Sequence, residues 1–286
     1  MSKPHPAPPT PQLLKDQFEQ RSGFALEMRT LRALRDAGFD CQHGLLYVDP
    51  VTDLDRQFDL RAVVYRKRCC IRLAVECKGV REGHPLMFGR LPRIPEESQH
   101  QVLVSSADDL DPGQPHKPPI YEKHAKAETL YGRESLYLPD KPVAKTYLHY
   151  STSPKNEPDE IHVRWMQAVA SSSDLLFIAH DEYTRMEVDE CATFILPMVV
   201  VPEGSIWVID YASSGEPLGD PTQEDRVEFA IFKSVTGPKL YGSDLRLSHL
   251  EFVTEQGLLS RIRFLLSPEG LRAIFPKIYF AQNADD

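Results

Sequence analysis

Two neighbouring segments alternate apolar and polar side chains, which predicts a β-hairpin near residue 60. They are residues 57–65, QFDLRAVVY, and residues 70–78, CIRLAVECK, joined by RKRC. A turn at Lys67-Arg68 would pair residues whose numbers sum to 135. One face of the hairpin is then wholly apolar, with the pairs Phe58–Cys77, Leu60–Val75, Ala62–Leu73 and Val64–Ile71. A slip of one residue would turn this apolar set to the wrong face, so the register is well specified.

The remaining pattern predicts an α/β protein. Helical spacing indicates a helix over residues 13–37, in two pieces around Ser22-Gly23, and another over 159–175. Strands are expected at CQHGLLYVD (41–49), VAKTYLHY (143–150) and ILPMVVVP (195–202), with SIWVIDY (205–211) forming a second hairpin with the last. Residues 82–142 are proline-rich and carry the acidic run DDLD, which favours an irregular insertion or mobile arm.

Length and composition are those of an ordinary globular protein. The chain has 286 residues, 41% hydrophobic and 26% charged. We expect a disordered, proline-rich tail over 1–12 and one domain over 13–286. Its core would span 22–80 and 143–212, with 82–142 as the insertion and 213–286 as a C-terminal extension. No run of about 20 apolar residues and no secretory signal is evident, so a cytoplasmic protein without membrane association is expected.

The charge distribution is uneven. The net charge of −9 argues against a protein that coats nucleic acid non-specifically. Residues 61–93 nevertheless hold nine basic side chains and only two acidic ones, Glu76 and Glu82. Such a run is usually a solvated face, but here it surrounds the predicted hairpin and raises the prospect of an anionic partner.

The polar face of the hairpin holds candidate chemistry. The register sets Asp59 opposite Glu76, with Cβ atoms about 4.5–5.5 Å apart, and Lys78 follows on the same face. Two carboxylates this close repel each other, whereas a divalent cation between them would stabilise the pair. The five cysteines form no C-x-x-C pair and the histidines show no zinc-ligand spacing, so carboxylates rather than thiolates are the candidate ligands.

The constellation Asp59…Glu76-Cys77-Lys78 resembles the PD-(D/E)xK superfamily of restriction-endonuclease-like nucleases. The resemblance implies an αβββαβ core with a mixed sheet, here with the long irregular insertion and C-terminal additions. It also implies a Mg²⁺ or Mn²⁺ ion held by Asp59, Glu76 and the Cys77 carbonyl, with Lys78 orienting the attacking water. A helical glutamate that often completes such sites would be Glu27, in GFALEMRTLRAL. The proline of the family's name is absent, since Phe58 precedes Asp59.

The expected function is therefore a metal-dependent nuclease that hydrolyses phosphodiester bonds, with DNA as the expected substrate, acting in bacterial defence or repair. Candidate nucleic-acid contacts are Arg61, Arg72, Arg81, Arg164 and Gln167. Three alternatives stay open. The E-x-K tripeptide also occurs on many solvated strands. The fold could serve as a nucleic-acid or protein docking subunit without catalysis. The 82–142 insertion could be the interface of a regulatory partner in a multi-component system.

Overall fold

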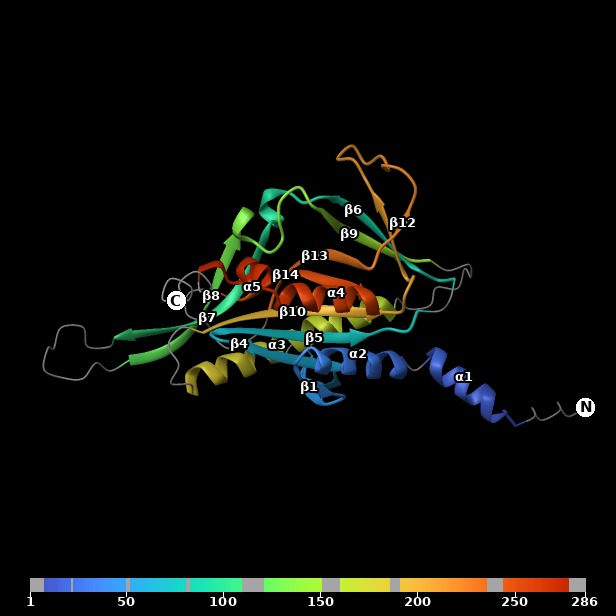
Figure 1. Ribbon diagram of the computed structural model, residues 1–286, viewed down its shortest axis with the longest axis horizontal. Helices are drawn as coiled ribbons and strands as arrows, with labels where there is room; N and C mark the ends of the chain where they lie inside the picture. Colours follow the sequence, from blue (N-terminus) through green and yellow to red (C-terminus); the bar gives the residue numbers. More distant parts are fainter. Residues whose placement is uncertain are drawn as a thin grey trace, which may run out of the picture.

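The computed structural model (Figure 1) is an α/β protein with one large mixed sheet. It describes residues 8–21, 23–49, 52–80, 83–109, 121–150, 160–185, 191–235 and 244–277. Its helices are α1 (Pro11–Arg21), α2 (Phe24–Asp36), α3 (Glu160–Arg185), α4 (Glu255–Leu266) and α5 (Pro268–Ile274), with short 3₁₀ helices at Pro95–Glu97 and Gly132–Glu134. Its strands are β1 (Asp40–His43), β2 (Leu46–Val48), β3 (Asp55–Gln57), β4 (Leu60–Arg66), β5 (Cys69–Cys77), β6 (Leu86–Pro92), β7 (Gln99–Asp109), β8 (Tyr121–Tyr131), β9 (Pro142–His149), β10 (Ala192–Val201), β11 (Ile206–Asp210), β12 (Thr222–Gln223), β13 (Arg226–Ser234) and β14 (Arg246–Thr254).

The β4–β5 hairpin has the register that its apolar face requires. Leu60 pairs with Val75, Ala62 with Leu73 and Val64 with Ile71, as predicted. The fourth pair is wrong, because the ladder ends at Leu60 and Phe58 leaves it. The Phe58 ring packs instead against the guanidinium of Arg61 and the ring of Tyr47.

The sheet follows the order β1-β4-β5-β10-β14-β13-β9-β6-β11-β12, with β7 and β8 attached beside β10. Its centre is parallel, because β10 runs parallel to both β5 and β14. Along the chain, α2, β1, the β4–β5 hairpin, α3 and β10 occur in this order, with β1 and β4 antiparallel and β10 parallel to β5. Strands β2 and β3 intervene before the hairpin, and β6 to β9 intervene before α3.

Helices cover both faces of the central strands. Helices α2, α4 and α5 share one apolar core with β5 and β10, through side chains such as Leu34, Leu265, Leu73 and Leu196. The opposite face packs on α3, which contributes Leu175, Leu176 and Ala179 to a second core. The parallel strands β5 and β10 are buried along their whole length, as expected for strands covered on both sides.

Several predictions about the flanking segments were wrong. The described parts of 82–142 are not irregular, since they form β6, β7 and β8, whose alternation is obscured by polar and proline residues. Strand β9 lies between β13 and β6, far from the hairpin. Strand β11 pairs with β6 and β12 rather than with β10. The segment 213–286 is no mere extension, because its strand β14 is a central neighbour of β10.

Two helix boundaries have a clear local cause in the sequence. The first helical segment divides at Gly23, whose φ of 68° is readily adopted only by glycine. Ser267 caps α5 by accepting a hydrogen bond from the Gly270 N–H, ahead of Pro268. The expected 1–12 tail lies mostly outside the described residues, and α1 already begins at Pro11. Within the described residues no helix is long and apolar enough to cross a membrane.

Candidate carboxylate site at the end of β5

The site is built where β4 bends away from β5. At Asp59 the chain leaves the ladder, and its carbonyl oxygen accepts a hydrogen bond from the Gly44 N–H at 3.1 Å. Phe58 donates its N–H to the Leu45 carbonyl oxygen at 3.2 Å. The Asp59 carboxylate takes the vacated place beside β5, since its Oδ2 accepts a hydrogen bond from the Cys77 N–H at 2.8 Å. The bend thus holds Asp59 at the carboxyl end of β5.

Glu76 lies next to Asp59 with its side chain fully buried. Its Oε1 is 3.5 Å from the backbone nitrogen of Asp59, so each carboxylate contacts the backbone of the other's strand. Burial raises the pKa of the Cys77 thiol well above its usual range, and the negative charges of Asp59, Glu27 and Glu76 raise it further. The three carboxylates expected to cooperate therefore lie around one residue of β5.

Helix α2 brings Glu27 to the same end of the strand. A methyl group on Gly23, the residue before α2, would lie 3.7 Å from the Cys77 carbonyl oxygen and 3.8 Å from Glu27 Oε1. Gly23 thus leaves space between a carboxylate and a backbone carbonyl. His43 Nε2 of β1 is 3.0 Å from Glu27 Oε2. Sequence spacing gave no sign of this contact, because it depends on β1 lying beside α2.

Lys78 follows directly on β5 and is partly buried. Its N–H donates to the Val200 carbonyl oxygen at 2.8 Å, so the pairing with β10 continues past the last residue of β5. The backbone at Lys78 is therefore held beside the Cys77 carbonyl and the Glu76 carboxylate.

The residues at this end fit a hard divalent cation by donor type. Carboxylate and carbonyl oxygens are the ligands that Mg²⁺ and Mn²⁺ prefer. A side chain at position 23 would contact both the Glu27 carboxylate and the Cys77 carbonyl oxygen, and glycine keeps that position unfilled. The ligand geometry itself is not formed: among the described residues no group of three or more His, Cys, Asp and Glu side chains is arranged to hold a metal ion. Hydrogen bonds from Cys77 N–H to Asp59, and the contact of Glu27 with His43, occupy oxygens that a metal would use.

Tyr47 is a further neighbour that the sequence analysis missed. Its hydroxyl is buried and makes no hydrogen bond within the described part of the chain. Burial raises the pKa of Tyr47 beyond its usual range, with further increases from Asp49 and Glu76. Tyr47 is the buried residue of the short strand β2. Its ring contacts the Phe58 ring and the Arg61 guanidinium.

The basic residues of the hairpin are arranged differently from the expectation. Arg61 and Arg72 were candidate nucleic-acid contacts, but both are buried against α3. Arg61 is ion-paired with Asp174 and donates to Ser171 Oγ at 2.9 Å, and Arg72 is ion-paired with Glu182. Neither guanidinium is accessible to a phosphate in this conformation. Both stabilise the contact between the sheet and α3.

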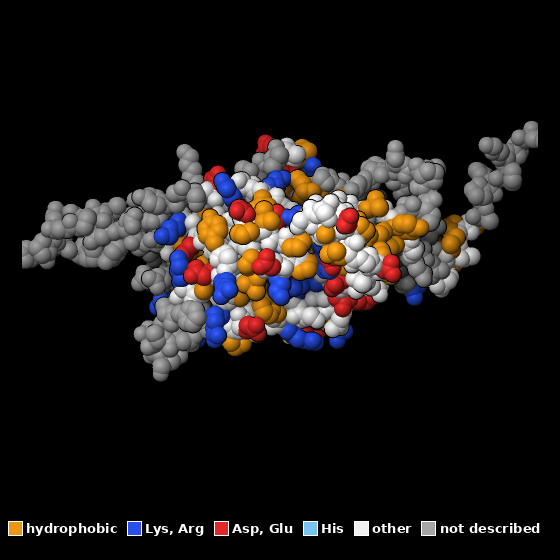
Figure 2. Space-filling model, turned by 90° about the horizontal axis from the view of Figure 1, so that it is seen from above, with side chains coloured by type: hydrophobic (Ala, Val, Ile, Leu, Met, Phe, Trp, Pro, Cys, Tyr) orange, Lys and Arg blue, Asp and Glu red, His pale blue; other side chains and the backbone are white. Residues whose placement is uncertain are grey.

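The other candidate contacts add little to a common surface. Arg81 and the side chain of Arg164 lie outside the described residues, and Gln167 is partly buried on α3. Arg90 and Arg93, from the same basic run, lie on β6 and just beyond it, at the other end of the sheet. Figure 2 shows basic, acidic and hydrophobic side chains interspersed on the face seen from above. The basic run is therefore not one surface.

Comparison with known proteins gives no relationship: no family model, no curated protein and no solved structure matches the chain significantly.

Proposed function

We propose that the protein is a metal-dependent nuclease whose site is formed by Glu27, Asp59, Glu76 and Lys78. The observation that supports this most strongly is that the three carboxylates, separated by up to 49 residues in sequence, gather around Cys77 at the end of one buried strand. Burial of Glu76 beside a second carboxylate disfavours the charged forms of both, and a divalent cation between them would reverse that effect.

The cofactor would be Mg²⁺ or Mn²⁺, held by Asp59, Glu76 and the Cys77 carbonyl, with Glu27 on the α2 side. A bound ion of this type supplies a polarised phosphoryl oxygen and a more acidic water. The chain's own residues would do the rest. Lys78 would donate to a phosphate oxygen or hold the attacking water. The bend at Asp59 and the cap at Gly23 would keep the acidic groups on one side of the strand end.

A second candidate is a nuclease-like docking module without catalysis. It is favoured by one observation, namely that no metal-holding group of three side chains is formed among the residues described. The nuclease is the preferred proposal, because carboxylates from α2, from the start of the hairpin and from β5 lie near the same carbonyl oxygen.

A cleavage assay separates these functions. The purified protein is incubated with duplex DNA, single-stranded DNA and RNA, with Mg²⁺, Mn²⁺, Ca²⁺ or chelator. The nuclease proposal expects cleavage with Mg²⁺ or Mn²⁺ and little with Ca²⁺ or chelator. Asp59→Asn should be inactive yet folded, because asparagine keeps an acceptor for the Cys77 N–H. The matched control is Asp55→Ala, an exposed aspartate on β3. Equal cleavage by Asp59→Asn, or none by the wild type on any substrate, would contradict the proposal.

A further inference from the structure

A second polar site lies on α4, β13 and the loop from residue 136 to 142. It is a cavity of about 690 Å³, a volume typical of small-molecule sites. Five cationic side chains line it: Arg90, Arg93, Lys141, Arg226 and Arg261. None of its lining residues belongs to the carboxylate site at the end of β5.

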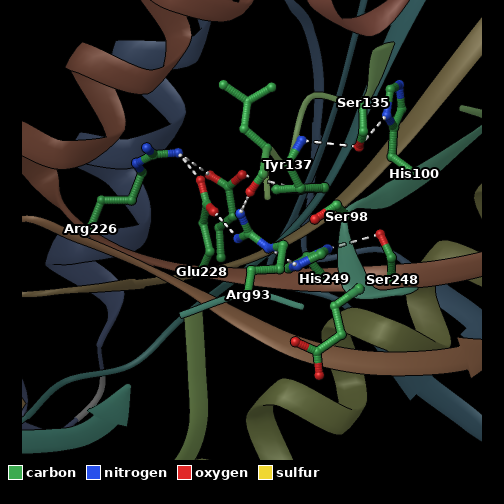
Figure 3. A network of polar contacts seen from close by, with 12 residues as sticks. Arg93, Ser98, His100, Ser135, Tyr137, Arg226, Glu228, Ser248 and His249 are labelled. Carbon is green, nitrogen blue, oxygen red and sulfur yellow. Dashed lines mark hydrogen bonds and ion pairs between the residues drawn. The ribbon is translucent and has the colours of Figure 1, made fainter. Parts of the chain in front are cut away.

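Arg93 lines this cavity from below the surface, with its side chain fully buried. Arg93 donates to the Leu138 carbonyl oxygen at 2.7 Å and to His249 Nε2 at 3.2 Å, and it is ion-paired with Glu228 (Figure 3). Burial and the charge of Arg93 hold the pKa of His249 well below its usual range. The imidazole is therefore neutral and accepts from Arg93, which leaves Nδ1–H to donate to Ser248 Oγ.

Glu251 is the second anion of this network and is fully buried. It accepts a hydrogen bond from Arg261 Nε at 2.8 Å, is also ion-paired with Arg261 Nη2, and accepts from the Tyr137 hydroxyl at 3.2 Å. Arg226 Nη1 lies between the two acids, 3.0 Å from Glu228 Oε1 and 3.6 Å from Glu251 Oε2. Three guanidinium groups thus share two carboxylates.

This arrangement leaves positive charge at the inner end of the cavity. Arg226 Nη1 is buried without a hydrogen bond in the described part of the chain, although it has ion-pair contacts. Lys141 follows in the same loop, where its carbonyl oxygen accepts the Arg93 N–H, and its side chain is exposed. No ion pair of Lys141 is formed with the residues that the structure describes.

Carboxylates also line the cavity, namely Glu224, Asp225 and Glu228. There Arg90 is matched by both Asp210 and Glu224. Asp225 lies against Gly257 and accepts a hydrogen bond from the Thr254 hydroxyl at 3.0 Å. Leu136, Leu138 and Phe264 add apolar wall to the cavity. The cavity therefore offers carboxylate acceptors and apolar side chains beside its cations.

We propose that this cavity binds a phosphate monoester attached to a ring-bearing body, the chemistry shared by a nucleoside monophosphate and the phosphorylated end of a strand. The phosphate would be bound by Arg226 and Lys141, since a guanidinium group held in place by buried carboxylates is well suited to phosphate oxygens and Lys141 is exposed beside it. The apolar wall would cover the ring. Glu224 and Asp225 would accept hydrogen bonds from its amino or hydroxyl groups.

Titration calorimetry with the full chain tests this proposal, with AMP as the probe and adenosine, inorganic phosphate and the dinucleotide pApA as comparisons. AMP should bind at least roughly tenfold more tightly than adenosine or phosphate, because each alone makes half of the contacts. pApA binding as tightly as AMP would assign the site to strand ends, and exclusion of pApA would assign it to free nucleotides.

Three variants keep the test decisive. Arg226→Gln should weaken AMP binding by roughly tenfold or more, the scale of one lost charged hydrogen bond. Lys141→Gln changes only the exposed rim, so its expected loss of about fivefold does not depend on the buried network. Ser260→Trp, on the exposed side of α4, should block the cavity.

The control is Arg263→Gln, exposed on the same helix, which should bind AMP as tightly as the wild type. No binding of AMP at about 10 mM, or equal binding by wild type, Lys141→Gln and Ser260→Trp, would overturn the proposal and leave the network a purely structural one.

Discussion

Removing Asp174 from α3 should destabilise the protein, because it would leave the charge of Arg61 buried against the sheet. Arg61 is 5% exposed, whereas Asp174 is 31% exposed. Loss of one partner of a fully buried ion pair costs roughly 3–5 kcal/mol, and the partial access of water to this pair reduces the expectation to about 2–3 kcal/mol. Ser171 and the Phe58 ring, 4.0 Å from the guanidinium carbon, would remain in contact with Arg61.

The free energy of unfolding is measured by urea denaturation, followed by circular dichroism and tryptophan fluorescence. Asp174→Ala is compared with Asp181→Ala, an exposed aspartate on the same helix, which should change stability by less than about 0.5 kcal/mol. The double variant Arg61→Met, Asp174→Leu should recover most of the loss, since an apolar pair needs no compensation for a buried charge. An Asp174→Ala protein as stable as the wild type would refute a structural role for Arg61 and return it to the candidate phosphate contacts.

Three further predictions concern other parts of the molecule. Gly257→Ala in α4 should lower the free energy of unfolding by more than about 2 kcal/mol, because the new Cβ would lie 2.0 Å from the Asp225 carbonyl oxygen. This clash outweighs the better helix propensity of alanine. Urea unfolding of the variant beside exposed Ser260→Ala measures the change, and a stabilised Gly257→Ala protein would contradict the prediction. Burial lowers the pKa of His100 to about 4 and holds that of His249 well below its usual range, so the unfolded chain binds more protons than the folded chain below about pH 6.5. Stability should therefore fall as the pH decreases from 6.5 to 4, by up to about 3 kcal/mol from His100 alone. Unfolding curves at several pH values should show the same slope in exposed His149→Gln, and a flat profile would show that these buried histidines titrate normally. Lys78→Ala should lower kcat by roughly 10²-fold with little loss of nucleic-acid affinity. The control Arg68→Ala, at the exposed turn of the same hairpin, should keep the wild-type kcat. Equal kcat in the two variants would show that Lys78 is only a salt-bridge partner.

The part of the fold that the sequence predicts best is the hairpin, because its alternation, its turn and its apolar face all specify one register. The same reasoning fails at Phe58. Its apolar side chain fits the alternating pattern, but its backbone N–H bonds to the Leu45 carbonyl oxygen instead of β5, and its ring packs against the Arg61 guanidinium. Leu45, which accepts the Phe58 N–H, is distant in sequence, so the alternation within the hairpin gives no sign of this contact. The buried strands of residues 82–142 were missed for another reason, since their apolar positions are mixed with histidine, glutamine and proline side chains that the tertiary structure accommodates.

The candidate site was partly predictable. The hairpin register predicted that Asp59 and Glu76 lie close together, but Asp59 lies outside the ladder and approaches β5 through its side chain. Glu27 was predicted from resemblance to a known arrangement. Arg61 and Arg72 were misassigned, because a basic run in sequence alternates between faces in a strand and its exposure depends on what covers each face. The acidic partners Asp174 and Glu182 lie on α3, about 110 residues away, so no local pattern could reveal that these arginines are buried. The cationic cavity beside α4 likewise joins β6, β13 and α4.

Manganese binding to the full chain tests the central claim most directly. The electron paramagnetic resonance signal of free Mn²⁺ is recorded during titration with the protein in the presence of a short DNA duplex, and the same titration of the duplex without protein is the control. If the carboxylates at the end of β5 hold a catalytic ion, the wild type should bind one Mn²⁺ per chain in addition to the Mn²⁺ that the duplex binds, and Glu76→Gln should bind none. A free Mn²⁺ signal that is the same with and without the wild-type protein, or equal uptake by Glu76→Gln, would contradict the claim.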